Sequence, residues 1–178
     1  MIKKELVHHL LSQLQLSTNS IHGPAHWARV LENGRKLAKE TGACLLVVEY
    51  FAVFHDSCRQ SDGRDPEHGR RGAELAASLR DSLYQVTDED FALLEYACIY
   101  HDKGYIESDI TIQTCWDSDR LDLPRAGITI NPKRLCTPAA KDKEMIRWAD
   151  QRSRQRIILE KIFEEWKLNQ RGEAVADA

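Results

Sequence analysis

A histidine and an aspartate stand side by side at the end of the most apolar run of this chain. His55 and Asp56 follow residues 45–54, where Glu49 is the only charged side chain. A regular element of that composition is buried almost all round. An imidazole and a carboxylate at its end are costly unless a bound cation or a hydrogen-bond network satisfies them. The pair therefore indicates a metal site or a buried polar network, and we expect further ligands elsewhere in the sequence.

Histidines and aspartates far along the chain could complete such a site. His26 precedes the pair, and Asp119 follows it within the segment 116–122, which reads Trp-Asp-Ser-Asp-Arg-Leu-Asp. Imidazole nitrogens and carboxylate oxygens are common ligands of divalent metals. We expect a metal-binding set of His26, His55, Asp56 and Asp119. His22, at the entrance of the helix that carries His26, is expected to be an outer residue of this site.

Composition places these residues in one ordinary soluble domain. The 178 residues are 42% hydrophobic and 30% charged, so we expect one domain over residues 1–170 with a frayed tail over 171–178. A chain of this length buries roughly 70% of its unfolded surface, so it needs no metal merely to fold. The formal charge of −3 argues against duplex nucleic acid as a partner, whereas a small anionic substrate is compatible with it.

Cysteine spacing and the N-terminal segment bear on the cellular compartment. The five cysteines are widely spaced and form no Cys-x-x-Cys pair, which argues against a zinc-ribbon or thioredoxin-like motif. The N-terminal segment lacks the apolar core of a signal peptide, and no stretch approaches the roughly 20 apolar residues of a membrane span. We therefore expect a cytoplasmic protein with no membrane partner. Cys58, which lies close to Asp56, is expected to be an inert thiol rather than a nucleophile.

Hydrophobic periodicity predicts an all-α fold, a single-domain helical bundle. Apolar residues recur at helical spacing, and proline, glycine and acidic residues mark helix ends. The expected helices are 2–14, 24–41, 43–58, 66–83, 87–100, 112–123 and a last long helix over 138–166. His55 and His101 both end apolar helices, where the helix dipole favours a nearby cation. On the helix before Pro124, Asp119 and Asp122 share a face while Asp117 points elsewhere, which makes Asp119 the expected ligand.

These residues resemble the ligands of the HD-domain metal-dependent phosphohydrolases. The ligand order of that family is a histidine, then His-Asp on a later helix, then a distant aspartate; His26, His55-Asp56 and Asp119 follow this order. The flanking sequences are similar as well, over roughly residues 21–130, and comprise His26-x-x-Arg29-Val30, Glu67-His68-Gly69-x-x-Gly72-Ala73 and 117–122. Four positions in order, each in a helical context, are far more specific than a lone His-Asp pair. The resemblance implies an HD-type helical bundle.

The resemblance also implies a divalent metal held by two imidazoles and two carboxylates, with room for water and a phosphate oxygen. Mn, Fe, Co, Ni, Zn and Mg all suit such ligands. The implied activity is hydrolysis of a phosphate ester in a small phosphorylated compound, for which a nucleotide is a candidate. Asp56 or Asp119 would orient the attacking water. Ser57, Cys58 and Arg59 stand where some nucleotidase members carry acidic residues, which argues against a 5′-nucleotidase.

Two further histidines leave the number of ions open. Some members of the family bind a second metal, and His68 and His101 would hold it here, with Asp56 as the bridging carboxylate. Alternatively, His68 makes a local hydrogen bond and His101 contacts the phosphate of the substrate.

Loop cations are candidates for substrate binding. Arg59, Arg64 and Lys103 could grip a phosphate, although exposed loop cations are often only solvated. Arg29 and Arg120 are as apt to pair with structural carboxylates as to touch a ligand.

Two other classes of function share these sequence features. A metal-bound nucleotide sensor would bind the same ligands without turnover and would be stabilised by them. A binuclear iron oxygenase would require His68 and His101 as ligands and would consume oxygen. The sequence leaves the oligomeric state open.

Overall fold

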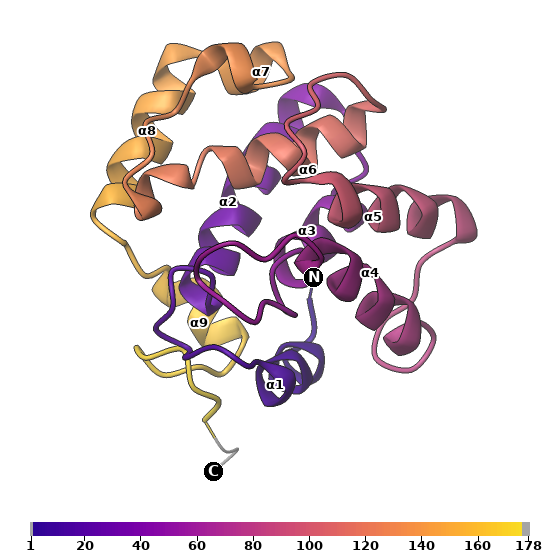
Figure 1. Ribbon diagram of the computed structural model, residues 1–178. Helices are drawn as coiled ribbons and strands as arrows, with labels where there is room; N and C mark the ends of the chain where they lie inside the picture. Colours follow the sequence, from indigo (N-terminus) through magenta and orange to yellow (C-terminus); the bar gives the residue numbers. More distant parts are fainter. Residues whose placement is uncertain (1, 176–178) are drawn as a thin grey trace.

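The computed structural model describes residues 2–175, which fold as a bundle of helices (Figure 1). In chain order the α-helices are α1 (Lys4–Gln13), α2 (Pro24–Thr41), α3 (Leu45–Phe54), α4 (His68–Leu79), α5 (Asp88–Tyr100), α6 (Ile110–Arg120), α7 (Pro138–Lys141), α8 (Lys143–Arg154) and α9 (Glu160–Glu165). The 3-10 helices η1 (Leu123–Ala126) and η2 (Pro132–Arg134) lie between α6 and α7. The described residues form no β-strand, so the predicted all-α, single-domain bundle is confirmed. No helix within 2–175 has the length and apolar character that crossing a bilayer requires.

Most helices begin and end near the predicted positions because the local signals act as expected. Pro24 occupies the first turn of α2, and Gly42 ends that helix in the left-handed conformation with a φ of 73°, as a C-terminal glycine commonly does. α3 is shorter than the expected helix 43–58 and ends at Phe54. His55 and Asp56 therefore lie in the turn that follows a buried helix.

The single long helix expected over residues 138–166 is wrong. The chain forms α7, α8 and α9 there instead. Asp142 separates the first two, because its side chain accepts hydrogen bonds from the Glu144 and Met145 backbone amides and so starts a new helix. α8 stops shortly before Arg156, whose φ of 49° lies in the left-handed region. Apolar spacing alone does not register a side-chain cap of this kind.

The last described residues are hydrogen-bonded rather than frayed. The Val175 amide donates to the Lys167 carbonyl, and the Asn169 amide donates to the Glu173 carbonyl. Segment 167–175 therefore folds back on itself. Residues 176–178, the rest of the predicted tail, lie outside the described residues.

Helix α3 lies in the middle of the bundle and determines where the polar residues meet. It contacts α1, α2, α4, α5 and α6, and α2 also contacts α6. Phe51 and Phe54 of α3 are fully buried, as are Trp27 of α2 and Trp116 of α6. Burying each of these large side chains contributes roughly 2–3 kcal/mol relative to leaving it exposed. The packed aromatic core thus holds the ends of α2, α3 and α6 in one region.

Two glycines allow α4 to approach the ends of α3 and α5. A Cβ atom on Gly72 would overlap the Phe54 carbonyl oxygen, and one on Gly69 would overlap the Cys98 carbonyl oxygen. A backbone oxygen cannot rotate out of the way as a side chain can, so only glycine permits this approach. The close packing brings His68, the first residue of α4, to the ends of the two neighbouring helices.

Replacing Gly72 with alanine tests this account of helix packing. Alanine favours a helix by about 1 kcal/mol over glycine, yet we expect Gly72→Ala to lower the free energy of unfolding by about 1–3 kcal/mol because of the overlap. The measurement is urea denaturation followed by circular dichroism. Gly63→Ala is the control: its Cβ meets nothing closer than 3.4 Å, so its stability should stay within about 0.5 kcal/mol of wild type. A Gly72→Ala protein as stable as wild type would contradict the account.

Candidate metal centre

Four polar side chains from three helices meet inside the bundle. His26 lies on α2, His55 and Asp56 follow α3, and Asp119 lies in the last turn of α6. His26 and His55 are fully buried, while Asp56 is 2% and Asp119 9% exposed. The structure therefore brings together all four residues expected as ligands from the sequence.

Each imidazole Nε2 of these residues lies close to the other and to one oxygen of each carboxylate. His26 Nε2 lies 3.1 Å from His55 Nε2 and 3.5 Å from both Asp56 Oδ2 and Asp119 Oδ1. His55 Nε2 lies 3.7 Å and 3.8 Å from the same two oxygens. Ligands bound at about 2.1 Å lie about 3.0 Å apart in an octahedron and about 3.4 Å apart in a tetrahedron. The atoms of His26, His55 and Asp119 form a group that could hold one ion. Asp56 Oδ2 lies beside both imidazole nitrogens, and we call the four atoms together the first ligand set.

The contacts of Nδ1 in the two imidazoles determine whether the facing Nε2 atoms carry a proton or a lone pair. His55 Nδ1 lies 3.0 Å from the Phe51 carbonyl oxygen, and His26 Nδ1 lies 2.8 Å from Asp122 Oδ2. Both partners are acceptors, so in a neutral ring each Nδ1 carries the proton and each Nε2 is left with a lone pair. Two lone pairs that face each other need either a shared proton or a metal cation between them. Metal-binding histidines are commonly oriented by such acceptors.

A second group of ligand atoms repeats this arrangement on the other side of Asp56. His68 Nε2 lies 3.2 Å from Asp56 Oδ1 and 2.8 Å from His101 Nε2, and His101 Nε2 lies 3.7 Å from Asp56 Oδ1. The outer nitrogens again contact carbonyl oxygens: His101 Nδ1 that of Cys98 at 2.7 Å, and His68 Nδ1 that of Asp65. These atoms, the second ligand set, could hold another ion. Asp56 faces the two sets with different oxygens.

Burial and neighbouring groups determine the charges of the first ligand set. Burial lowers the pKa of His55 to about 3, so its ring stays neutral near pH 7. Burial opposes ionisation of Asp56, but His55 and hydrogen bonds with the surrounding histidines hold the pKa of its carboxyl well below the usual range. Burial also opposes ionisation of Asp119, yet His55 and Arg125 lower the pKa of that carboxyl. The set thus offers the neutral nitrogen of His55 and two charged carboxylates, the forms that bind metal.

Asp122 and His22 support the ligands from outside. Asp122 accepts from His26 through one oxygen and from Arg29 Nε through the other, at 2.8 Å. His22 Nδ1 lies 2.5 Å from Asp56 Oδ2, which fits the outer place expected for it. His22 also forms a possible ligand group with His26 and Asp56. Sequence reasoning placed Asp122 on the Asp119 face of its helix but gave it no role.

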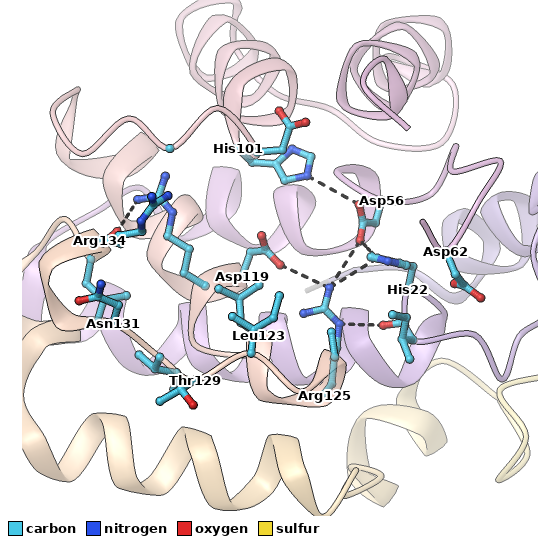
Figure 2. A pocket seen from close by; sticks show the side chains of 18 of the residues that line it. His22, Asp56, Asp62, His101, Asp119, Leu123, Arg125, Thr129, Asn131 and Arg134 are labelled. Atoms are coloured by element: carbon cyan, nitrogen blue, oxygen red, sulfur yellow. Dashed lines mark hydrogen bonds and ion pairs between the residues drawn. The ribbon is translucent and has the colours of Figure 1, made fainter. Parts of the chain in front are cut away.

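Arg125 is the residue of this site that sequence reasoning missed. Its Nε donates to the Ile21 carbonyl at 2.7 Å and one of its terminal nitrogens donates to the Asp122 carbonyl at 2.9 Å. The other terminal nitrogen points into the cluster, 3.8 Å from Asp56 Oδ2 and 3.9 Å from Asp119 Oδ1 (Figure 2). The side chain is 4% exposed. The only signal was its position three residues after Asp122.

The expected phosphate-binding cations are not equally placed. Arg59 Nε donates to Asp56 Oδ1 at 2.9 Å, so this residue reaches the site. Arg64 is exposed and does not line the pocket beside the cluster. Lys103 is exposed as well and pairs with Asp102 at 2.9 Å. The structure brings only Arg59 of these three to the ligands.

Asp117 and Arg120 contact the backbone of a neighbouring segment. Asp117 accepts from the Cys136 amide at 2.7 Å and from the Thr137 amide at 2.8 Å, so it points away from the ligands, as expected. Arg120 donates to the Arg134 carbonyl at 2.9 Å. Both residues fix segment 134–137 against α6.

A pocket of about 620 Å³ lies beside both ligand sets (Figure 2). Asp56, His101 and Asp119 line it at one end, and Arg134 lies across it in the close view. Apolar side chains that include Leu123, Ile128 and Ile130 line it as well. The volume falls in the usual range for small-molecule sites, roughly 300–1,000 Å³.

No family model matches this chain, and neither a curated protein nor a solved structure matches it. Membership of the HD-domain family therefore stays a prediction, based on the order and context of the ligand residues.

Metal binding should stabilise the chain through the first ligand set. We expect Mn²⁺ at 100 times its dissociation constant to raise the free energy of unfolding by about 2.7 kcal/mol. His55→Gln should abolish this stabilisation, because it removes one of the buried nitrogens. His9→Gln, a substitution outside both ligand sets, should retain it.

Thermal denaturation with and without Mn²⁺, before and after treatment with EDTA, provides the measurement. Equal stabilisation of wild type and His55→Gln by Mn²⁺ would show that the metal binds elsewhere.

Proposed function

We propose that this chain is a metal-dependent phosphohydrolase of the HD-domain type, which cleaves a phosphate ester of a small phosphorylated compound. One observation carries the proposal: two pairs of imidazole nitrogens flank the carboxylate of Asp56. Asp56, His101 and Asp119 line a pocket that arginines also line. The ligand sets are suited to a divalent cation, and arginine is the residue best suited to phosphate.

The charges around the pocket favour a phosphate ester over a neutral substrate. Among the described residues that line it, four aspartates are matched by four arginines: Asp56, Asp62, Asp102 and Asp119, and Arg59, Arg120, Arg125 and Arg134. A divalent cation would leave the pocket with two excess positive charges. A phosphomonoester, which carries roughly −1.5 to −2 charges at pH 7, offsets that excess.

The ligand residues also have distinct parts to play in hydrolysis. A bound divalent cation supplies a Lewis acid that polarises a phosphoryl oxygen and lowers the pKa of a water molecule. Asp56 uses both of its oxygens to contact histidines and Arg59. Asp119 is the most exposed member of the first ligand set and lines the pocket. We therefore assign Asp119, rather than Asp56, to orient the attacking water.

We assign Arg125 to bind the phosphate group. Hydrogen bonds to two backbone carbonyls fix its side chain, while the remaining terminal nitrogen lies just beyond hydrogen-bonding distance of Asp56 and Asp119. That nitrogen has a long contact with His22 Nδ1, at 3.5 Å, and a phosphate oxygen in the pocket would give it an anionic partner. A positive charge fixed in advance stabilises the charge of a phosphoryl transition state without reorganisation.

The apolar wall of the pocket suits a substrate with an apolar or aromatic part. Ile128 is 51% exposed, and Leu123 and Ile130 line the same pocket. A nucleobase could pack on this wall while Asn131, also in the lining, supplies hydrogen bonds. A nucleotide is therefore the substrate class to test first.

The test is an assay of the chain stripped of metal and resupplied with Mn²⁺, Fe²⁺, Co²⁺, Ni²⁺, Zn²⁺ or Mg²⁺ in turn. We expect metal-dependent release of phosphate from p-nitrophenyl phosphate or from a nucleotide. Nucleotide binding without product would indicate a sensor, and oxygen consumption would indicate the binuclear oxygenase that the second ligand set also permits. Either result without hydrolysis would contradict the proposal.

Arg125→Gln tests whether Arg125 binds the phosphate group of the substrate. We expect kcat/KM to fall by roughly 100-fold or more, since one preorganised donor to transition-state charge is typically worth that much. Mn²⁺ content should be retained, because Arg125 is not a ligand. Arg64→Gln is the comparison: it removes an exposed arginine that does not line the pocket, so kcat/KM should not change. Equal losses in both variants would contradict the placement of the phosphate beside Arg125.

A further inference from the structure

The side chain of Arg59 lies against the second ligand set. Its Nε donates to Asp56 Oδ1 at 2.9 Å, and one terminal nitrogen lies 3.5 Å from His68 Nε2. These are two of the three atoms that a second metal ion would use. The guanidinium thus contacts the lone pairs that such an ion needs.

The loop after α3 is built to keep Arg59 in this position. The other terminal nitrogen of Arg59 donates to the carbonyl oxygens of Ser61 at 3.1 Å and Gly63 at 3.2 Å. Asp65 closes the same loop by accepting from the Gln60 amide at 2.9 Å, and Arg71 donates to Asp65 as well. The Arg59 side chain is 12% exposed. Arg59 is therefore a fixed part of the site rather than a solvated surface cation.

The two ligand sets differ in how closely an arginine approaches them. Arg59 makes a hydrogen bond to the Asp56 oxygen of the second set. Arg125 stays 3.8 Å and 3.9 Å from the oxygens of the first set, beyond hydrogen-bonding distance. A divalent ion could enter the first set without displacing a hydrogen-bonded cation. In the second set, the ion would meet a cation that is already bound to the shared carboxylate. It would either break the hydrogen bond between Arg59 and Asp56 or be repelled by the positive charge of the guanidinium beside it.

We propose that Arg59 acts as a built-in second cation, so that this chain holds one divalent ion in the first ligand set and works with a single metal. This inference rests on the proposed metal centre and specifies how many ions it uses. Asp56 then joins one ion and one guanidinium instead of bridging two ions. Arg59 is a residue that determines metal number rather than a metal ligand.

The test is titration of the metal-free full-length chain with Mn²⁺ by calorimetry, with elemental analysis after gel filtration. Wild type should retain one equivalent. Arg59→Gln should take up a second equivalent, with an affinity for that ion on the order of 10- to 100-fold above wild type, the usual scale for groups that contact ligands from outside. Arg59→Gln combined with His68→Ala should return to one. Arg70→Gln, which removes an exposed arginine paired with Glu67, should behave as wild type.

The outcomes separate failure of this inference from failure of the metal centre. If wild type binds two equivalents of Mn²⁺ equally tightly, the inference is overturned and the metal centre is not. The same holds if a folded Arg59→Gln protein still binds only one equivalent of Mn²⁺. No Mn²⁺ uptake by wild type or Arg70→Gln would overturn both. Arg59→Lys keeps the positive charge and should hold one equivalent; two would overturn the inference even where Arg59→Gln does not fold.

Discussion

The site depends on one electrostatic constraint: two pairs of buried imidazole nitrogens face each other. When the rings are neutral and carry their proton on Nδ1, neither facing Nε2 has a proton. The facing distances are 3.1 Å between His26 and His55 and 2.8 Å between His68 and His101. In all four rings Nδ1 contacts a carbonyl or carboxylate oxygen, which assigns the proton to the outer side. Lone pairs held together in this way call for positive charge. A divalent cation would supply it for the first pair, and Arg59 would supply part of it for the second.

The fold imposes this constraint through packing far from the ligands. The aromatic core around α3 fixes His55 and Asp56 at the end of a buried helix, where their side chains cannot turn to water. Gly69 and Gly72 let α4 approach closely enough for His68 to reach Asp56. Most of the free energy that holds the ligands in place therefore comes from apolar burial. The polar cluster itself is costly to bury, which is expected of a functional site.

The sequence was most informative where chemistry and periodicity coincide. His55 and Asp56 stand out because charged groups at the end of an apolar helix need partners, and helical spacing correctly separated Asp119 from Asp117. Arg125 was missed because its position depends on the 3-10 turn η1 after α6, and its role on backbone carbonyls that the sequence does not place. The prediction of one long helix over 138–166 was wrong because a side-chain cap at Asp142 outweighs continuous apolar spacing. Arg64 and Arg59 share a loop, and only hydrogen-bond geometry distinguishes them.

Anomalous X-ray diffraction from crystals of the chain soaked in Mn²⁺ tests the central claim most directly, because it locates the ion without reference to activity. The account predicts a strong anomalous peak about 2.0–2.3 Å from His26 Nε2, His55 Nε2, Asp56 Oδ2 and Asp119 Oδ1. It also predicts Arg59 still bonded to Asp56. Absence of any peak there, with His26 and His55 still 3.1 Å apart, would contradict the account and leave these residues as a buried polar network.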